Sequence, residues 1–159
     1  MNDDARFEDG GDKPLNLGAL DAEDLKVLST LTQDAVFPAN EMQWVPSERR
    51  FAVLLNRFRW EDLKAAKTRN RVVERVQSLL VVDNVTHVAS QGVARDEADT
   101  VLSLLSIAFS AGEDAEGVIE LMLAGDGGVR LQVEALEVSL RDVTRPYAAP
   151  SKSAPHHEV

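Results

Sequence analysis

The sequence has no cysteine, few aromatic residues and no long hydrophobic run. Without cysteine, the chain forms no disulfides and no cysteine metal sites, and it has no thiol nucleophile. No segment approaches the roughly eighteen apolar residues of a membrane-spanning helix. The first thirteen residues are acidic and polar, unlike a signal peptide. We therefore expect a cytoplasmic protein without a membrane span.

The length and composition indicate one folded domain. A chain of 159 residues, 44% hydrophobic and 28% charged, is large enough to bury a core without metals or disulfides. Both ends lack a hydrophobic pattern, and the last residues are small, polar and contain proline. We expect a disordered acidic tail over 1–13, one globular domain over 14–147 and a second disordered tail over 148–159.

Charge is distributed unevenly along the chain. The formal net charge is −10, yet the segment from Arg49 to Arg75 holds nine of the seventeen basic residues against three acidic ones. This segment, the basic band, therefore carries +6 and the remainder of the chain −16. A chain this acidic repels nucleic acid and anionic membranes over most of its surface.

The clearest local prediction is a helix from Ala22 to Thr32. Asp21 is placed to cap it, acidic residues occupy its first turn, and leucines follow at helical spacing. The preceding segment 15–19 is a candidate short strand.

The middle of the chain predicts about seven strands, because apolar residues alternate and turn signals recur. Residues 46–49, Asp83-Asn84 and 125–128 are the turns, and the last is the strongest hairpin signal. Residues 61–68 are expected to form a connection, and 70–80 also fits a helix. The predicted strands are 41–45, 50–60, 75–82, 85–93, 100–111, 118–124 and 129–133.

A closing helix is expected over 133–143, because Val133, Leu136, Leu140 and Val143 fall at helical spacing. The resulting class is α+β, an antiparallel barrel or sandwich with an N-terminal and a C-terminal helix. Consecutive strands with tight turns favour a meander. This element order is similar to that of pleckstrin-homology-like domains, an analogy that implies no function.

The sequence shows no catalytic pattern. His87 has no second ligand at metal spacing, and His156 and His157 lie in the C-terminal tail. The acidic segments 96–99 and 113–116 lack a calcium-loop pattern, and the glycines at 125–128 lack phosphate-loop spacing. We assign no catalytic residue, metal or cofactor.

The basic band is the candidate binding surface. In a strand that continues to Trp60, Phe58 and Trp60 face one side while Arg57 and Arg59 face the other. We expect the aromatic residues in the core and the arginines at a rim; a bulge near Asn56 would bring them onto one face. The candidate binding residues are Arg57, Arg59, Lys64, Lys67, Arg69 and Arg71.

Several segments carry a family resemblance: "LGALDAEDLKVLSTLTQDAV", "RRFAVLLNRFRWE", "DTVLSLLSIAF" and "GDGGVRLQVEALEVSLRDV". With these, the chain resembles domain-of-unknown-function family 2948, an uncharacterised family found chiefly in alphaproteobacteria. The resemblance covers about residues 15–147. It implies one intact domain in a bacterial protein and no activity, cofactor or site.

We therefore expect a non-catalytic interaction module that uses the basic band to dock an acidic protein partner or a phosphorylated ligand. Nucleic-acid binding through the same band, with Trp60 stacking on bases, is an alternative that the net charge disfavours. An enzyme acting through carboxylates and arginines is another. Self-association of the basic band with acidic loops of a second copy is also open.

Overall fold

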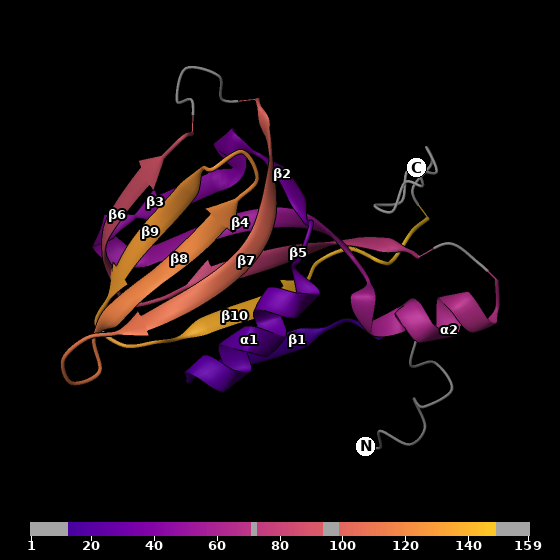
Figure 1. Ribbon diagram of the computed structural model, residues 1–159, viewed down its shortest axis with the longest axis horizontal. Helices are drawn as coiled ribbons and strands as arrows, with labels where there is room; N and C mark the ends of the chain where they lie inside the picture. Colours follow the sequence, from indigo (N-terminus) through magenta and orange to yellow (C-terminus); the bar gives the residue numbers. More distant parts are fainter. Residues whose placement is uncertain (1–12, 71–72, 94–98, 149–159) are drawn as a thin grey trace.

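The protein folds into two facing layers of antiparallel strands, with helix α1 packed beside them and a short helix, α2, projecting from one end (Figure 1). The computed structural model describes residues 13–70, 73–93 and 99–148. Residues 1–12 and 149–159, on which the predicted disordered tails fall, lie outside the described residues.

The described residues form ten strands joined in one sheet. Its order is β1-β10-β5-β4-β2-β7-β8-β9-β6, with β3 paired to β4 outside this path. Within these residues β1 and β6 are the two ends of the order, so the sheet is open rather than a closed barrel. An antiparallel, sandwich-like α+β fold is therefore confirmed. The strands are β1 (Asn16–Ala19), β2 (Val36–Pro38), β3 (Met42–Val45), β4 (Arg50–Phe58), β5 (Arg75–Val82), β6 (Val85–Gln91), β7 (Val101–Ala111), β8 (Gly117–Leu123), β9 (Gly128–Val133) and β10 (Val138–Asp142).

The seven strands expected from alternation correspond to β3 to β9. In β5, buried Val76, Ser78, Leu80 and Val82 alternate with less buried residues, so this segment is a strand and not the alternative helix. The strongest turn signal is also confirmed: β8 and β9 pair, and positive φ at Gly125 and Asp126 matches the mirror-image turns that tight hairpins favour.

The meander prediction is wrong at Asp83-Asn84. β5 pairs with β4 and β10, whereas β6 pairs with β9 in the other layer. Asn84 has φ 63°, and the next residue, Val85, donates its backbone N–H to Arg49 O. The two residues therefore form a corner that carries the chain from one layer to the other, and not a hairpin.

The predicted C-terminal helix is also wrong, because β10 occupies this segment. Leu140 lies between Leu17 of β1 and Leu80 of β5, and Val138 and Leu140 are buried on one face. Because this segment pairs with both β1 and β5, its side chains alternate between the two faces of the sheet, although their spacing also fits a helix. The likeness to pleckstrin-homology-like domains rested on this helix and on barrel closure, and the described residues show neither.

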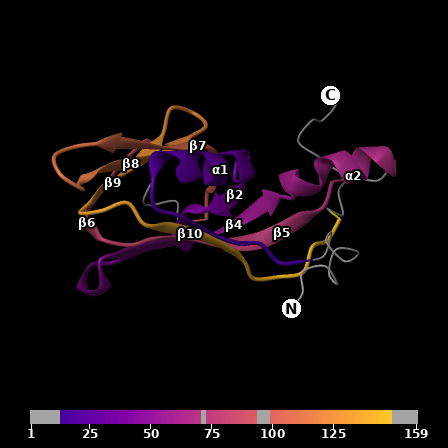
Figure 2. The same ribbon diagram turned by 90° about the horizontal axis from the view of Figure 1, so that it is seen from below.

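Helix α1 (Ala22–Leu31) agrees with its predicted position. The side chain of Asp21 accepts a hydrogen bond from Asp24 N, as expected of the cap. Leu25 and Leu28 are buried in the core, and Ser29 Oγ accepts a hydrogen bond from Ile107 N of β7. Helix α1 thus packs on β7 and on β1, as the view from below shows (Figure 2).

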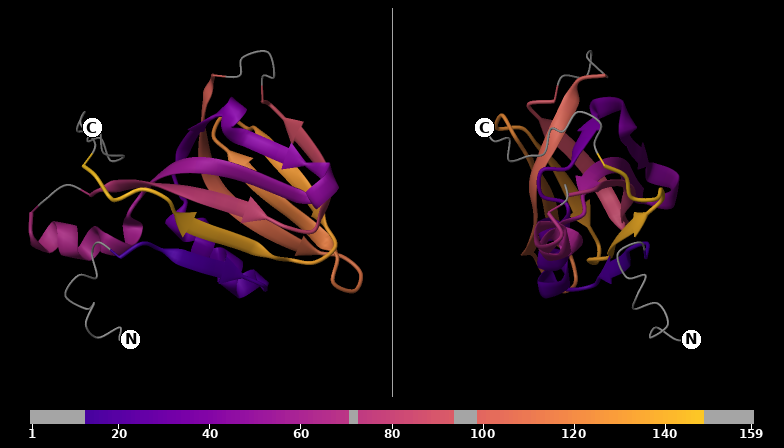
Figure 3. Two further views of the ribbon diagram at one scale, coloured as in Figure 1. Left: turned by 180° about the vertical axis from the view of Figure 1, so that it is seen from behind. Right: turned by 90° about the vertical axis from the view of Figure 1, so that its right-hand side faces the viewer.

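The expected connection over 61–68 is helical. The 3₁₀ helix η5 (Trp60–Asp62) follows β4 and leads into α2 (Leu63–Thr68). Two further 3₁₀ helices, η3 (Ala39–Glu41) and η4 (Pro46–Glu48), flank β3. Helix α2 lies beyond the end of the sheets in Figure 1, in Figure 2 and in the left view of Figure 3, and the described chain begins and ends at the same end of the molecule. Among the described residues, no helix has the length and apolar character to cross a membrane.

Candidate functional site: a buried ionic cluster and an exposed basic arm

An ionic cluster joins the ends of β4, β5 and β10 to η5, at the base of the projecting α2. Arg57 lies near the end of β4 and Arg59 follows this strand; the carboxylates come from η5, from the residue before β5 and from the last residue of β10. The members of the ionic cluster are Arg57, Arg59, Glu61, Asp62, Glu74 and Asp142.

Arg57 is the centre of the ionic cluster, and its side chain is 0% exposed. Its Nε donates to Ser78 Oγ at 2.8 Å. Its Nη1 donates to Phe58 O and Glu61 Oε1, and its Nη2 to Glu61 Oε2 and Asp142 Oδ1. A guanidinium group has five N–H donors, so every donor of Arg57 is used within the protein. Arg57 has no donor left for a ligand.

Asp142 holds this arrangement together from the far end of the chain. Its Oδ1 accepts hydrogen bonds from Arg57 Nη2 and from Ser78 Oγ, the latter at 2.6 Å. Its Oδ2 accepts a hydrogen bond from Leu15 N at 2.8 Å. The side chain is 3% exposed, and these donors replace the water that a buried carboxylate loses.

Arg59 forms the second half of the ionic cluster and is 3% exposed. Its Nη1 donates to Glu74 Oε1 at 2.7 Å and lies 3.4 Å from Asp62 Oδ2. Its Nε lies 3.9 Å from Glu61 Oε2, so Glu61 bridges the two arginines. These contacts attach η5 to the start of β5.

The ionic cluster contains two arginines and four carboxylates. The excess negative charge is carried partly by Glu61 and Glu74, whose side chains are 28% and 29% exposed and keep contact with water. Burial works against the charged form of Arg57, but the hydrogen bonds and charges of Glu61 and Asp142 outweigh it and raise the pKa of Arg57. Arg57 is therefore a permanently charged structural residue.

A second group of contacts surrounds Phe58. The guanidinium of Arg75 lies 4.0 Å from the centre of the Phe58 ring, and burial lowers the pKa of Arg75. Arg75 Nε donates to Asn56 Oδ1, and Asn56 Nδ2 donates to Tyr147 Oη. Trp60 packs at a tilt on Phe58 and donates its Nε1–H to Gln33 O. The aromatic residues thus take part in internal contacts.

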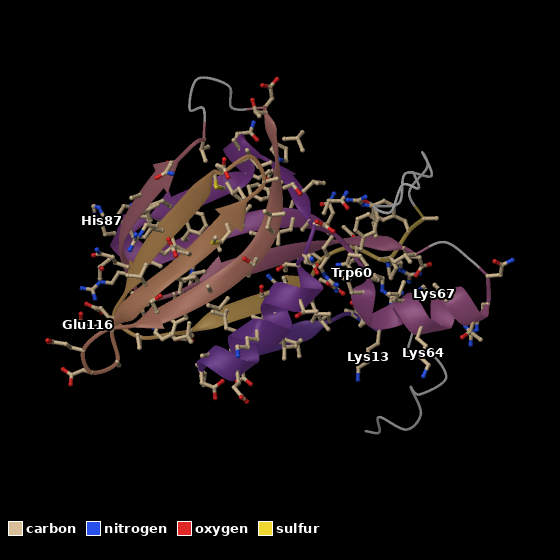
Figure 4. All side chains as sticks on the ribbon, in the orientation of Figure 1. Lys13, Trp60, Lys64, Lys67, His87 and Glu116 are labelled. Carbon is tan, nitrogen blue, oxygen red and sulfur yellow. The ribbon has the colours of Figure 1, made fainter. Side chains whose placement is uncertain are left out.

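The basic side chains that follow the ionic cluster along the chain are exposed. Lys64 and Lys67 lie on α2, and Arg69 is its C-cap residue. All three side chains are exposed, and none forms an ion pair or side-chain hydrogen bond within the described residues. We call Lys64, Lys67 and Arg69 the basic arm. Figure 4 shows Lys64 and Lys67 on α2, with Lys13 at the same end of the molecule.

Comparison with known proteins gives a match that covers the ionic cluster and the basic arm. Residues 15–157 match the model of a family described as "Protein of unknown function (DUF2948)". The chain belongs to this family. No match was found among curated proteins or among solved structures. The part matched to DUF2948 contains both the ionic cluster and the basic arm and excludes residues 1–14.

The structure describes five of the six candidate binding residues of this DUF2948 protein and divides these five into two sets. Lys64, Lys67 and Arg69 lie together in the basic arm, and Arg71 lies outside the described residues. The prediction that Arg57 and Arg59 lie at a rim is wrong, because both are buried. Arg57 shares the core-facing side of β4 with Phe51, Val53 and Leu55. Phe58 is buried as expected, whereas Trp60 is half-buried.

The sequence analysis missed the partners of the arginines. Glu61, four residues after Arg57, was the one visible signal; Asp142 is 85 positions away and Ser78 is 21. The other chemical candidates are not brought together. His87 is exposed on β6, and Glu116 is exposed just before β8. Both lie at the opposite end of the molecule from α2 (Figure 4). Among the described residues, no group of three or more histidine, aspartate or glutamate side chains is arranged to hold a metal.

Proposed function

We propose that the protein is a non-catalytic interaction module that docks an acidic protein segment on the basic arm. The observation that supports this is a contrast within one segment of the sequence. Arg57 uses all five donors internally, whereas Lys64, Lys67 and Arg69 are exposed and make no ion pair with any described residue.

The basic arm brings little benefit to the fold itself. Lys64 lies in the first turn of α2, where the positive end of the helix dipole disfavours a cation, and Lys67 lies one turn away, where like charges repel. A six-residue helix is not stable on its own. Helix α2 is held by the buried side chain of Ala66 and by the ionic cluster that precedes it. Lys64 therefore opposes the dipole of its own helix and is repelled by Lys67, although Lys67 itself suits the last turn. An exposed cation at the unfavourable position of Lys64 favours a role in binding.

The geometry favours an acidic peptide over a phosphorylated ligand. Phosphate sites converge several donors on one point, often through bidentate arginines. Arg57 and Arg59 are near in sequence but cannot provide such bidentate contacts to a phosphate. Their guanidinium groups already contact Glu61, Glu74 and Asp142. The basic arm instead spreads three charges along a projection, which matches an extended acidic segment. The absence of cysteine suits a cytoplasmic setting for such a module.

The test is a charge reversal of the basic arm. Fluorescein-labelled hexaglutamate is titrated against the full chain and against a variant with Lys64→Glu, Lys67→Glu and Arg69→Glu. Three exposed ion pairs at about 0.5–1 kcal/mol each predict that the variant binds at least about tenfold more weakly. The matched control reverses Lys26, Arg130 and Arg141, which are exposed on α1, β9 and β10. It has the same net charge and should change affinity less than about threefold.

Equal losses in the two variants would show that net charge alone attracts the peptide, and the proposal would fail. The same titrations with a phosphorylated peptide and with a single-stranded oligonucleotide distinguish the other ligands. Tighter binding of the oligonucleotide, with quenching of tryptophan fluorescence, would favour nucleic acid instead. A pull-down from cell extract with both variants then identifies the natural partner.

A further inference from the structure

Residues 1–12 are strongly acidic and join the described chain beside the end of the molecule that carries the basic arm. They contain Asp3, Asp4, Glu8, Asp9 and Asp12 against a single base, Arg6, a charge of −4. The described chain begins at Lys13, at the end of the molecule from which α2 projects (Figure 4). A negatively charged segment is therefore covalently attached at the end of the fold that carries the basic arm.

We propose that residues 1–12 bind the basic arm of their own chain and compete with the acidic partner. This inference rests on the proposed function, since it names what regulates access to the same surface. The acidic segment has the chemistry that the basic arm would recognise in a partner, namely several carboxylates along one stretch of chain. Lys64, Lys67 and Arg69 have no acidic partner within the described residues, so they are available to it.

The tether joins the fold at the end of the molecule that carries Lys64 and Lys67, as the position of Lys13 shows (Figure 4), and it is longer than α2. Twelve residues span at most about 40 Å when extended, whereas the six residues of α2 rise only about 9 Å. A ligand joined by a short flexible linker has an effective concentration in the millimolar range. Weak, solvent-exposed ion pairs therefore give substantial occupancy within the chain, although the same segment would bind poorly as a separate peptide.

Other basic residues of the basic band are less suited to the acidic segment. Arg49 donates to Glu134 at 2.6 Å, and Arg50 donates to Asp83 at 2.9 Å. Arg75 is held against Phe58 and Asn56. The basic arm thus concentrates the unpaired positive charge of the described basic band at one place.

The experiment neutralises the acidic segment without shortening the chain. The tail variant carries Asp3→Asn, Asp4→Asn, Glu8→Gln, Asp9→Asn and Asp12→Asn. The loop variant is the matched control, with the same charge change at exposed or half-exposed acids of β8 and the loops beside it. It carries Glu113→Gln, Asp114→Asn, Glu116→Gln, Glu120→Gln and Asp126→Asn. Both are titrated with fluorescein-labelled hexaglutamate.

The tail variant should bind hexaglutamate about three- to tenfold more tightly than the unmodified chain, because the competing segment no longer occupies the basic arm. The loop variant should gain less than about twofold. Equal gains would show a general effect of net charge and would overturn the inference. No gain in the tail variant, with hexaglutamate still bound, would overturn it as well.

A second readout separates this inference from the proposed function. Backbone amide resonances of Leu63 to Asn70 are compared between the unmodified chain and the tail variant, with no partner added. Shifts confined to these amides, absent in the loop variant and lost at high salt, support intramolecular docking even if hexaglutamate fails to bind. Unchanged amides overturn the inference even if hexaglutamate binds the basic arm.

Discussion

Arg57 and Lys64 carry the same charge seven positions apart, yet they differ in what they leave for a partner. Arg57 is fully buried and donates to a serine, a backbone carbonyl and two carboxylates. Lys64 is exposed and makes no ion pair among the described residues. Burial and donor use therefore separate a cation that is saturated within the protein from a cation that is exposed to solvent.

Substitution of Arg57 tests the structural half of this distinction. Arg57→Met should lower the free energy of unfolding by about 3–5 kcal/mol, because Asp142 stays buried without its cationic partner. Lys64→Met should change it by less than about 0.5 kcal/mol. Urea denaturation of both variants measures the difference. A loss below about 1 kcal/mol for Arg57→Met would contradict a structural role.

At the scale of elements, α2 offers a test of how its cations affect the helix. Lys64→Glu should increase protection of the Arg69 amide, which donates to Ala65 O, because an acid in the first turn complements the dipole. Lys67→Glu should decrease it, because Lys67 lies in the last turn. Each change corresponds to about 0.3–1 kcal/mol, a factor of about two to five in the exchange rate. Changes of the same sign in both variants would contradict this account.

Elements with local signals could be predicted from the sequence, whereas elements defined by distant partners could not. Helix α1 has its cap within the segment, and β3 to β9 alternate visibly. β10 fits both periods, and only its place between β1 and β5 decides for a strand. Asp83-Asn84 signals a turn, but its sequence does not say which strands the turn connects.

The candidate site divides in the same way. The exposure of Lys64, Lys67 and Arg69 was predictable, because lysine and arginine side chains in a short connection are mostly exposed. The burial of Arg57 was not, since the carboxylate of Asp142 reaches it only through the pairing of β10 with β5. The alternation in β4 placed Arg57 on the side of Phe51, Val53 and Leu55, which is the core side.

For the whole molecule, salt should separate binding from stability. The basic arm lies on the surface, where the screening length shortens from about 20 Å near 20 mM salt to below about 6 Å near 300 mM. The members of the ionic cluster with 3% or less exposure, such as Arg57 and Asp142, are screened far less. Measurements over one range of salt concentrations therefore test both the basic arm and the ionic cluster.

Raising salt across this range should weaken hexaglutamate binding by at least about tenfold while the free energy of unfolding changes by less than about 1 kcal/mol. The tail variant should lose more affinity than the unmodified chain, because in the latter salt also releases residues 1–12 from the basic arm. The two affinities should then converge at high salt. Titrations and urea denaturation at matched salt concentrations measure these changes. Parallel curves that never converge would show that residues 1–12 do not compete for the basic arm.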